Sequence, residues 1–229
     1  MIRRCARASG RLLVVGLLVH AVAAHASAQE LADFDYENLS YRGLGAHWGY
    51  LWSGRVDPTP TYGVRMDLGY LGPGLRVVPG ITYWSSQMKA REVAELERRV
   101  EELIDRQDPG GAPASVDLGT IDWSDLMLSL DGHVVWRLGP SVLTFAGVGA
   151  AAHLLNGAGE AVADTFVEDL LDSVTAGANL HAGVELPLTS RLRTFGMGRL
   201  EVLGDLQYFE LRLGAQLMSG GTPEGDQTR

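Results

Sequence analysis

Ser129, Asp131 and His133 are the residue types of a hydrolytic triad, and they stand two positions apart in the sequence. Side chains of an extended strand alternate between its two faces, so all three would share one face. Alternate strand residues are about 6.6 Å apart, which leaves the serine and the histidine roughly 13 Å from each other. Because the histidine of a triad must bond to both partners, this spacing does not build one. We therefore expect no catalytic residues and predict that the protein is not an enzyme.

Charged residues recur on one face of the predicted strands and form a second candidate site. They are Arg65, Asp67, Asp131, Arg137, Glu185, Arg199, Glu201, Glu210 and Arg212. A buried charge needs an opposite partner, so this set predicts a salt-bridged polar interior. The same charges could instead form the selectivity-determining constriction of a narrow pore. One histidine per strand on this face is a weak pattern for a metal, and we expect neither a metal site nor a cofactor.

Eight segments in which apolar residues alternate with polar or small ones must position these charges. In the last segment Phe209, Leu211 and Leu213 lie on one face, and Glu210 and Arg212 lie on the other. The segments cover about residues 43–52, 62–70, 75–86, 126–137, 141–155, 178–186, 192–203 and 209–217. They predict an all-β fold, an eight-stranded antiparallel up-and-down transmembrane β-barrel with its apolar face toward lipid. A soluble periplasmic lipocalin-like barrel that binds a ligand would show the same alternation with the apolar face inward.

Two of the segments are irregular, and the connections between segments alternate in length. Pro79-Gly80 interrupts the third segment, and we predict a β-bulge there because proline cannot donate to a ladder. The fifth segment is rich in alanine and glycine and has no clear phase. Tight turns at Gly72-Pro73-Gly74 and Gly139-Pro140 alternate with longer connections, as in outer-membrane barrels.

Aromatic residues cluster near the ends of the predicted strands. Two such girdles are expected where a barrel crosses the two membrane interfaces. The predicted girdle residues are Tyr41, Trp52, Tyr62, Tyr70, Trp84, Trp123, Trp136, Tyr208 and Phe209.

The first residues of the chain have the pattern of a secretion signal. Arginines precede an apolar run from Leu12 to Ala24, and Ala26-Ser27-Ala28 is a cleavage site of small residues. We predict a cleaved signal peptide (1–28), an N-terminal periplasmic segment (29–40), the barrel (41–219) and a disordered polar tail (220–229). The mature chain would hold 15 basic and 28 acidic residues, because the signal carries four of the 19 basic ones and no acid. A net charge of 15 − 28 = −13 argues against nucleic acid as a partner.

Two of the longer connections contain helical patterns, at about 88–107 and 160–174. In the first, Val93, Leu96, Val100 and Leu103 form an apolar stripe with coiled-coil spacing. In the second, the predicted apolar side consists of Val162, Phe166, Leu170 and Val174. We expect the two helices to pack on each other or over the mouth of the barrel, because neither stripe is stable when exposed. Self-association through the first stripe is the alternative.

The strand pattern, the two tight turns and the aromatic girdles over residues 41–219 resemble those of small bacterial outer-membrane β-barrel proteins, the OmpA/OmpX-like superfamily. This resemblance implies an integral outer-membrane protein of a diderm bacterium, exported across the inner membrane. It also implies outer-membrane lipid, lipopolysaccharide and the barrel-assembly machinery as partners. Roles in such proteins range from structural anchoring and adhesion to passage of small solutes. The last predicted strand departs from the pattern, because it ends at Met218-Ser219 without an aromatic residue.

Overall fold

The computed structural model describes residues 39–107, 115–138, 141–161, 163, 165, 167, 171–204 and 206–219. The predicted signal peptide and the predicted polar tail lie outside these described residues, as does the periplasmic segment up to residue 38. The described strands are β1 (Gly43–Ser53), β2 (Thr59–Asp67), β3 (Tyr70–Gly72), β4 (Leu75–Gln87), β5 (Asp122–Leu138), β6 (Val142–Ala158), β7 (Ser173–Pro187), β8 (Leu192–Leu203) and β9 (Leu206–Met218). One described helix, α2 (Ala90–Gln107), lies between β4 and β5. No helix in the described part of the chain is long and apolar enough to cross a membrane.

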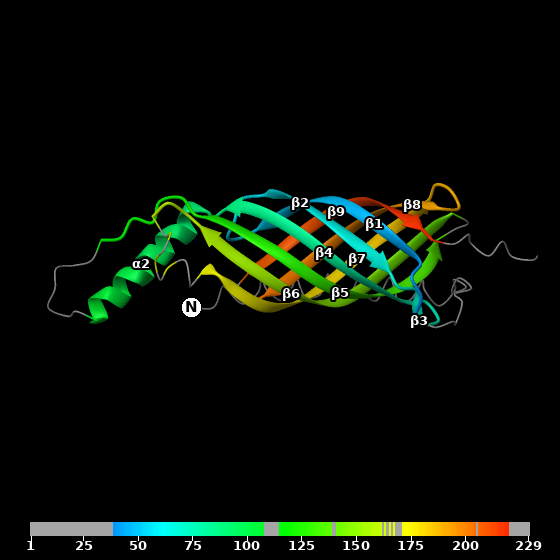
Figure 1. Cartoon of the computed structure of the whole chain (residues 1–229), viewed down its shortest axis with the longest axis horizontal. Coiled ribbons are helices and arrows are strands. Elements are labelled where there is room, and N and C mark those ends of the chain that lie inside the picture. The colour runs from blue at the N-terminus through cyan, green and yellow to red at the C-terminus, as the bar shows by residue number, and fades with distance from the viewer. Residues whose placement is uncertain are drawn as a thin grey trace, which may run out of the picture.

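Antiparallel pairing closes the sheet into a barrel (Figure 1). From β4 to β9 each strand pairs with the next one along the chain, β9 pairs with β1, and β1 pairs with β2. The pairing of β2 with β4 closes the ring, and the short β3 continues β2 along the edge of β4. Since β2 and β3 form one interrupted strand, the described residues build a closed eight-stranded barrel, as the sequence predicts.

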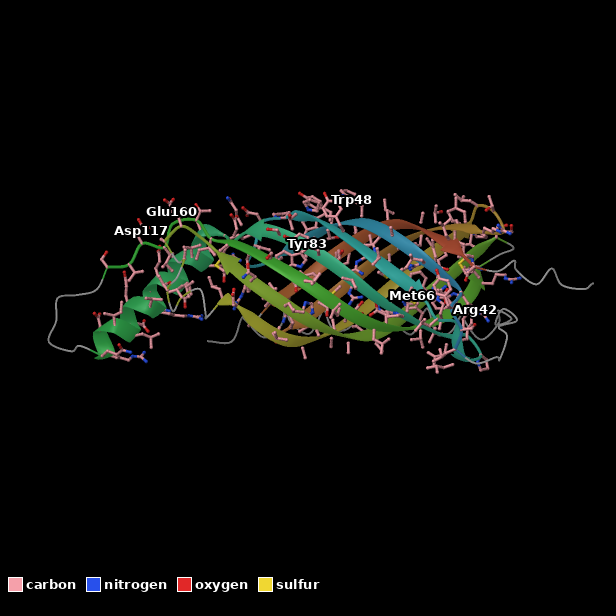
Figure 2. The ribbon with its side chains drawn as sticks, in the orientation of Figure 1. Arg42, Trp48, Met66, Tyr83, Asp117 and Glu160 are labelled. Carbon is pink, nitrogen blue, oxygen red and sulfur yellow. The ribbon has the colours of Figure 1, made fainter. Side chains whose placement is uncertain are left out.

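Apolar side chains cover the outside of the barrel, and polar side chains fill its inside. On β9, Phe209, Leu211 and Leu213 are exposed, whereas the intervening Glu210 and Arg212 are buried. The same alternation continues around β1, β5 and β7. The labelled side chain of Trp48 projects from the outer surface in Figure 2. The predicted faces of these strands are therefore confirmed, and the apolar face does not point inward as in the lipocalin-like alternative.

The predicted bulge at Pro79-Gly80 is wrong, because β4 keeps one register with β5 along its whole length. The bulge lies on the neighbouring strand, where Leu68 donates to Val77 and Val77 donates to Gly69. Leu68 and Gly69 therefore both lie opposite Val77, which defines a bulge. Gly69 adopts a φ of 76°, which glycine reaches without strain. Alternate nitrogens of a strand point the same way, so the nitrogen of Pro79, like that of Val77, points toward the strand that contains the bulge. Proline has no N–H to donate on that side.

The longer connections gather at the end of the barrel that carries α2 (Figure 1). They are the β1–β2 loop, the insertion that contains α2, the β6–β7 connection and the short β8–β9 turn. The tight β3–β4, β5–β6 and β7–β8 turns lie at the opposite end. This alternation matches the sequence prediction.

The described residues contain one helix where the sequence predicts two. α2 matches the first predicted insertion, at about 88–107. In the second, residues 162, 164, 166 and 168–170 lie outside the described residues. The prediction of a helix to residue 174 is wrong, because β7 already begins at Ser173 and Val174 is 78% exposed. The strand pairing of this segment with β6 overrides its helical periodicity.

α2 packs on segments of its own chain. Its apolar face belongs to a buried cluster of Val93, Val100, Leu118, Ile121, Val167 and Leu171. On an adjacent face, Glu101 accepts a hydrogen bond from the N–H of Val116 at 3.0 Å, and Glu97 accepts one from Leu118 at 2.9 Å. The residues beyond the helix therefore run back along it toward the barrel. Because Val93 and Val100 are covered in this way, most of the stripe predicted for self-association is occupied within one chain.

Replacement of Gly69 by alanine tests the bulge. A Cβ there would lie 3.0 Å from the Arg42 side chain, on a backbone with positive φ. We expect Gly69→Ala to lower the free energy of unfolding by about 1–2 kcal/mol. Gly72→Ala is the matched control, because nothing lies within 4 Å of its added Cβ. Urea unfolding of the refolded barrel, followed by far-UV circular dichroism, measures both, and equal losses would contradict the assigned bulge.

Candidate functional site

Side chains from distant strands meet around Glu185 inside the barrel. Glu185 of β7 is fully buried and lies between two guanidinium groups. Arg65 of β2 donates to its Oε1 at 2.8 Å, and Arg76 of β4 donates to Oε1 at 2.7 Å and to Oε2 at 2.9 Å. The paired bonds from Arg76 are the bidentate arrangement that makes arginine–carboxylate contacts strong. One carboxylate therefore neutralises parts of two buried cations.

Asp67 supplies a second anion to these arginines, and Gln216 bonds to both charges. Arg76 Nη1 lies 3.5 Å from Asp67 Oδ2, and Gln216 donates to the same oxygen at 3.3 Å. Gln216 also accepts a hydrogen bond from Arg65 at 3.0 Å. The second oxygen of Asp67 accepts from the N–H of Gly69 at 2.8 Å, which ties the cluster to the bulge. These residues form the Glu185 cluster, which consists of Arg65, Asp67, Arg76, Glu185 and Gln216.

A second cluster surrounds Arg199 of β8, which is also fully buried. Arg199 donates to Asp131 at 2.7 Å and to Glu201 at 2.8 Å. Glu201 Oε1 lies 3.5 Å from His153 Nε2, and His153 Nδ1 lies 2.7 Å from Asp125 Oδ2. These five residues, named the Arg199 cluster, join β5, β6 and β8 through side chains.

Glu210 and Arg212 of β9 form a third buried pair. Arg212 Nη2 donates to Glu210 Oε2 at 2.7 Å, and the hydroxyl of Thr61 donates to the other carboxylate oxygen at 2.5 Å. Nearby, the guanidinium carbon of Arg65 lies 3.3 Å from the centre of the Phe195 ring. The aromatic face of Phe195 therefore also contacts the Arg65 cation.

Apolar layers lie above and below the charged interior. At the end opposite α2, Tyr70, Val135, Phe145 and Met197 pack together. At the α2 end, the layer contains Leu51, Val56, Trp84, Trp123, Leu155, Leu203, Leu206 and Tyr208. Between the layers, a cavity beside His47, Ser129 and His133 measures about 10 Å³. That volume holds about one water molecule, so paired side chains rather than solvent fill this part of the lumen.

The structure buries all of the predicted lumen charges except Arg137. The buried ones are Arg65, Asp67, Asp131, Glu185, Arg199, Glu201, Glu210 and Arg212. Arg137 is exposed near the end of β5, so its expected place in the network is wrong. Sequence reasoning missed Arg76, because the expected bulge obscured the phase of β4, and missed His153, because β6 had no assigned phase. The even-numbered phase of β4, read through Thr82 and Trp84, could have revealed Arg76.

The structure places the predicted girdle residues on both faces of the barrel. Tyr41, Trp52, Tyr62 and Phe209 are exposed on the outside, and Trp136 is half-buried. The buried ones, which do not belong to a girdle, are Tyr70, Trp84, Trp123 and Tyr208. The bulge at Gly69 reverses the phase of the chain before Tyr70. The other three lie on the inward phase of their strands and form part of the apolar layer at the α2 end.

Asp131 and His133 have partners in the interior other than those of a catalytic triad. Asp131 is bonded to Arg199 and to Asn179, and His133 Nδ1 faces Arg76 at 3.0 Å. Among the described residues no hydrogen bond joins Ser129, Asp131 and His133 into a triad. Within the same residues, no group of three or more histidine, cysteine, aspartate or glutamate side chains could hold a metal ion.

Neutralisation of Glu185 tests the energetic role of the Glu185 cluster. We expect Glu185→Gln to lower the free energy of unfolding by about 3–5 kcal/mol, because it leaves two buried guanidinium groups without their shared anion. Glu102→Gln is the control, since Glu102 lies exposed on α2 and should change stability by less than about 0.5 kcal/mol. Both are measured by urea unfolding. A loss for Glu185→Gln no larger than that of the control would show that the pairing does not stabilise the barrel.

The chain matches no protein-family model and no curated protein. It is similar in structure to Neisserial surface protein A, with a TM-score of 0.48 and 13% identity over 80% of this chain and 100% of that one. It is also similar to Ail, the attachment invasion locus protein of Yersinia pestis, with a TM-score of 0.46 and 12% identity over 80% and 99% of the two chains. A major outer membrane protein from Thermus thermophilus gives 0.46 and 15% over 78% and 99%. The eight-stranded barrel itself is established by the strand pairing of this chain.

Proposed function

We propose that this protein is an integral β-barrel of the outer membrane of a diderm bacterium, without enzymatic activity, that presents its α2 end at the cell surface. The observation that carries this proposal is the distribution of polarity. Charges are paired inside a closed barrel, and apolar side chains cover its outside. In water this surface would be larger than the apolar patches that soluble monomers carry. In a bilayer it contacts hydrocarbon, and the closed ring leaves no strand edge unpaired.

The exposed apolar residues extend around the full circumference of the barrel. Each of the eight strands contributes at least one, for example Trp48, Val64, Ile81, Leu128, Val148, Leu180, Leu200 and Leu213. A surface for one protein partner would occupy one side, whereas a belt on every strand matches contact with lipid. The belt therefore supports contact with outer-membrane lipid and lipopolysaccharide.

The filled interior supports a structural or surface-interaction role rather than conduction. The buried arginines are paired with carboxylates, and an apolar layer lies at each end of the lumen. An ion would have to break these pairs and cross both layers. We therefore assign the lumen charges to holding the barrel together.

The orientation follows from the position of the connections. The start of β1 and the end of β9 both lie at the end of the barrel opposite α2. There the N–H of Ser219 donates to the carbonyl oxygen of Arg42 at 2.8 Å. In outer-membrane barrels this end faces the periplasm and the longer connections face outward. Export by a cleaved signal (1–28) and insertion by the barrel-assembly machinery complete the proposal.

Arginine placed on the outer face at two depths tests membrane insertion. Leu211 lies near the middle of β9 and Leu217 near its end, and both face outward. In lipid, Leu211→Arg should lower the free energy of unfolding by about 2–4 kcal/mol and Leu217→Arg by about 0–1 kcal/mol. Unfolding in lipid vesicles measures both. Equal, small effects at the two depths would contradict a membrane-spanning barrel.

The filled lumen predicts a silent protein in planar lipid bilayers. Reconstituted protein should give no discrete current steps, because paired charges and two apolar layers block the path. Insertion is checked independently by the heat-dependent shift of the folded barrel in electrophoresis. Current steps whose size changes in Arg199→Ala would instead support the narrow-pore alternative.

A further inference from the structure

A hollow of about 540 Å³ lies on the outer wall of the barrel, where β1, β9, β8 and β7 run side by side. Trp48 of β1 lies at one edge of this outer hollow, and Val184 of β7 lies at the other. The volume falls within the range of about 300–1,000 Å³ that is usual for small-molecule sites. The outer hollow is therefore large enough to hold a ligand rather than a single side chain.

The floor of the outer hollow contains two glycines of β8 in place of outward side chains. Gly196 and Gly198 have the outward phase of the strand, since Met197 and Arg199 are buried. Neither glycine has a positive φ, so the backbone does not require glycine at these positions. A Cβ on Gly196 would lie 3.3 Å from the end of the Leu213 side chain. The two glycines thus determine the shape of the outer surface and not the path of the strand.

The aromatic side of the outer hollow is ordered by contacts of its own. The rings of Tyr50 and Trp52 meet edge to face with centroids 5.1 Å apart, and Trp52 stacks on Phe209 of β9 at 6.1 Å. The Tyr50 hydroxyl donates to the carbonyl oxygen of Pro58 at 3.3 Å. Trp48 projects from the same face of β1 (Figure 2). A wall that is already ordered loses little conformational freedom when a ligand binds.

The lining of the outer hollow presents no charge to a ligand. Arg212 contributes to the lining, but its side chain is buried inside the barrel, where it donates to Glu210 at 2.7 Å. The other lining residues are uncharged. Burial of a charged group against such a surface would be costly, so an apolar occupant is favoured.

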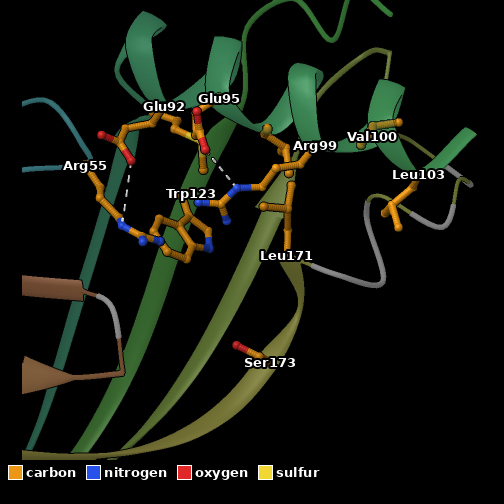
Figure 3. Close-up of a pocket in the computed structure, with 11 residues that line it drawn as sticks. Arg55, Glu92, Glu95, Arg99, Val100, Leu103, Trp123, Leu171 and Ser173 are labelled. Carbon is orange, nitrogen blue, oxygen red and sulfur yellow. Dashed lines mark hydrogen bonds and ion pairs between the residues drawn. The ribbon is translucent and has the colours of Figure 1, made fainter. Parts of the chain in front are cut away.

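The cavity between α2 and the mouth of the barrel has a different lining (Figure 3). There Arg55 lies 3.7 Å from Glu92, Arg99 lies 3.1 Å from Glu95, and all four residues line the cavity. These charges are already paired with each other, so they do not select a charged ligand. A hydrocarbon chain would displace their water, which makes this cavity less suited to it than the outer hollow.

The position of the outer hollow indicates what fills it. It is continuous with the apolar belt, since Trp48 and Leu213 belong to both. The core of a bilayer holds no water that could fill a gap in this belt. Two barrels have no hydrophobic driving force to associate in lipid and would need closely fitting surfaces, whereas a flexible hydrocarbon chain adapts to the hollow.

We propose that the outer hollow binds one acyl chain of a membrane lipid, held more tightly than the other lipids around the barrel. The chain would lie over Gly196 and Gly198, between the aromatic residues of β1 and Val184 of β7. This inference rests on the proposed function, because it requires the barrel to lie in a bilayer. It deepens that function by naming one site within the belt and the chemistry that occupies it.

Lipid binding is tested on the full mature chain in detergent micelles, titrated with dimyristoylphosphatidylcholine. Native mass spectrometry measures how many lipids each barrel retains at each lipid concentration. We expect the first lipid to bind at least tenfold more tightly than the second, because only one chain fits the outer hollow. Equal binding of the first and second lipids would overturn the proposal.

Variants locate the bound lipid. Gly196→Val combined with Gly198→Val fills the floor and should weaken binding of the first lipid at least tenfold. Ala150→Leu combined with Ala152→Leu is the matched control, because it adds the same number of carbon atoms to outward positions of β6, which does not line the hollow. The control should bind the first lipid as the unmodified chain does. Unchanged binding in the valine variant would place the lipid elsewhere and overturn the proposal.

The head group and a second copy of the chain are tested in the same way. Dimyristoylphosphatidylglycerol has the same acyl chains with an anionic head, and it should bind as tightly as the zwitterionic lipid. A tenfold preference for either head would show that the head is recognised and would contradict binding through the chain. Dimers that disappear in the valine variant would show that a second barrel occupies the hollow, which would also contradict it.

The outcomes separate this inference from the membrane proposal. Failure of the chain to insert into lipid vesicles would count against the membrane proposal. Insertion without a tightly bound first lipid would count against the outer hollow alone. If the valine variant does not fold, the ratio of first to second lipid binding on the unmodified chain still decides the question.

Discussion

Glu185 has no exposed surface, and its Oε1 lies 2.8 Å from a nitrogen of Arg65 and 2.7 Å from a nitrogen of Arg76. A closed eight-stranded barrel has an interior too narrow for bulk water, so each charge that points inward needs an opposite partner. Several of these partners are distant in sequence, as Arg65 and Arg76 are from Glu185 and Asp131 is from Arg199, and they meet only when their strands are in register. Charge pairing thus makes closure of the barrel cooperative, because loss of one strand would leave buried charges on several others without partners.

The same alternation that directs charges inward directs apolar residues outward, so the register of a strand fixes both of its faces at once. A register shift by one residue would bury the apolar face and expose the charged one. The bulge at Gly69 changes the phase of the chain between β2 and β3, and the N–H of Gly69 bonds to Asp67 of the Glu185 cluster. The polar core and the apolar surface are therefore two results of one constraint.

Much of this arrangement is readable from the sequence, where alternation is regular. Asp131, Glu185 and Arg199 have the predicted inward orientation because their strands keep strict period two. Tyr70 was predicted on the wrong face, because a bulge leaves little trace in the local pattern. Trp84, Trp123 and Tyr208 were assigned by their position at strand ends, whereas the phase of their own strands places them inside. The predicted helix at 160–174 extends too far, because pairing of β7 with β6 is a long-range interaction that local periodicity does not contain.

The central claim is that the barrel has a lipid-facing outside and a dry, lipid-free inside. Single-tryptophan proteins that retain only Trp48, which is 49% exposed on the outer face, or only Trp84, which is 1% exposed inside, test it directly. Each is reconstituted into vesicles of phospholipids brominated along the acyl chain, and its fluorescence is compared with that in unbrominated vesicles. We predict strong quenching of Trp48 and almost none of Trp84. Absence of quenching at Trp48, or equal quenching at both, would contradict the account.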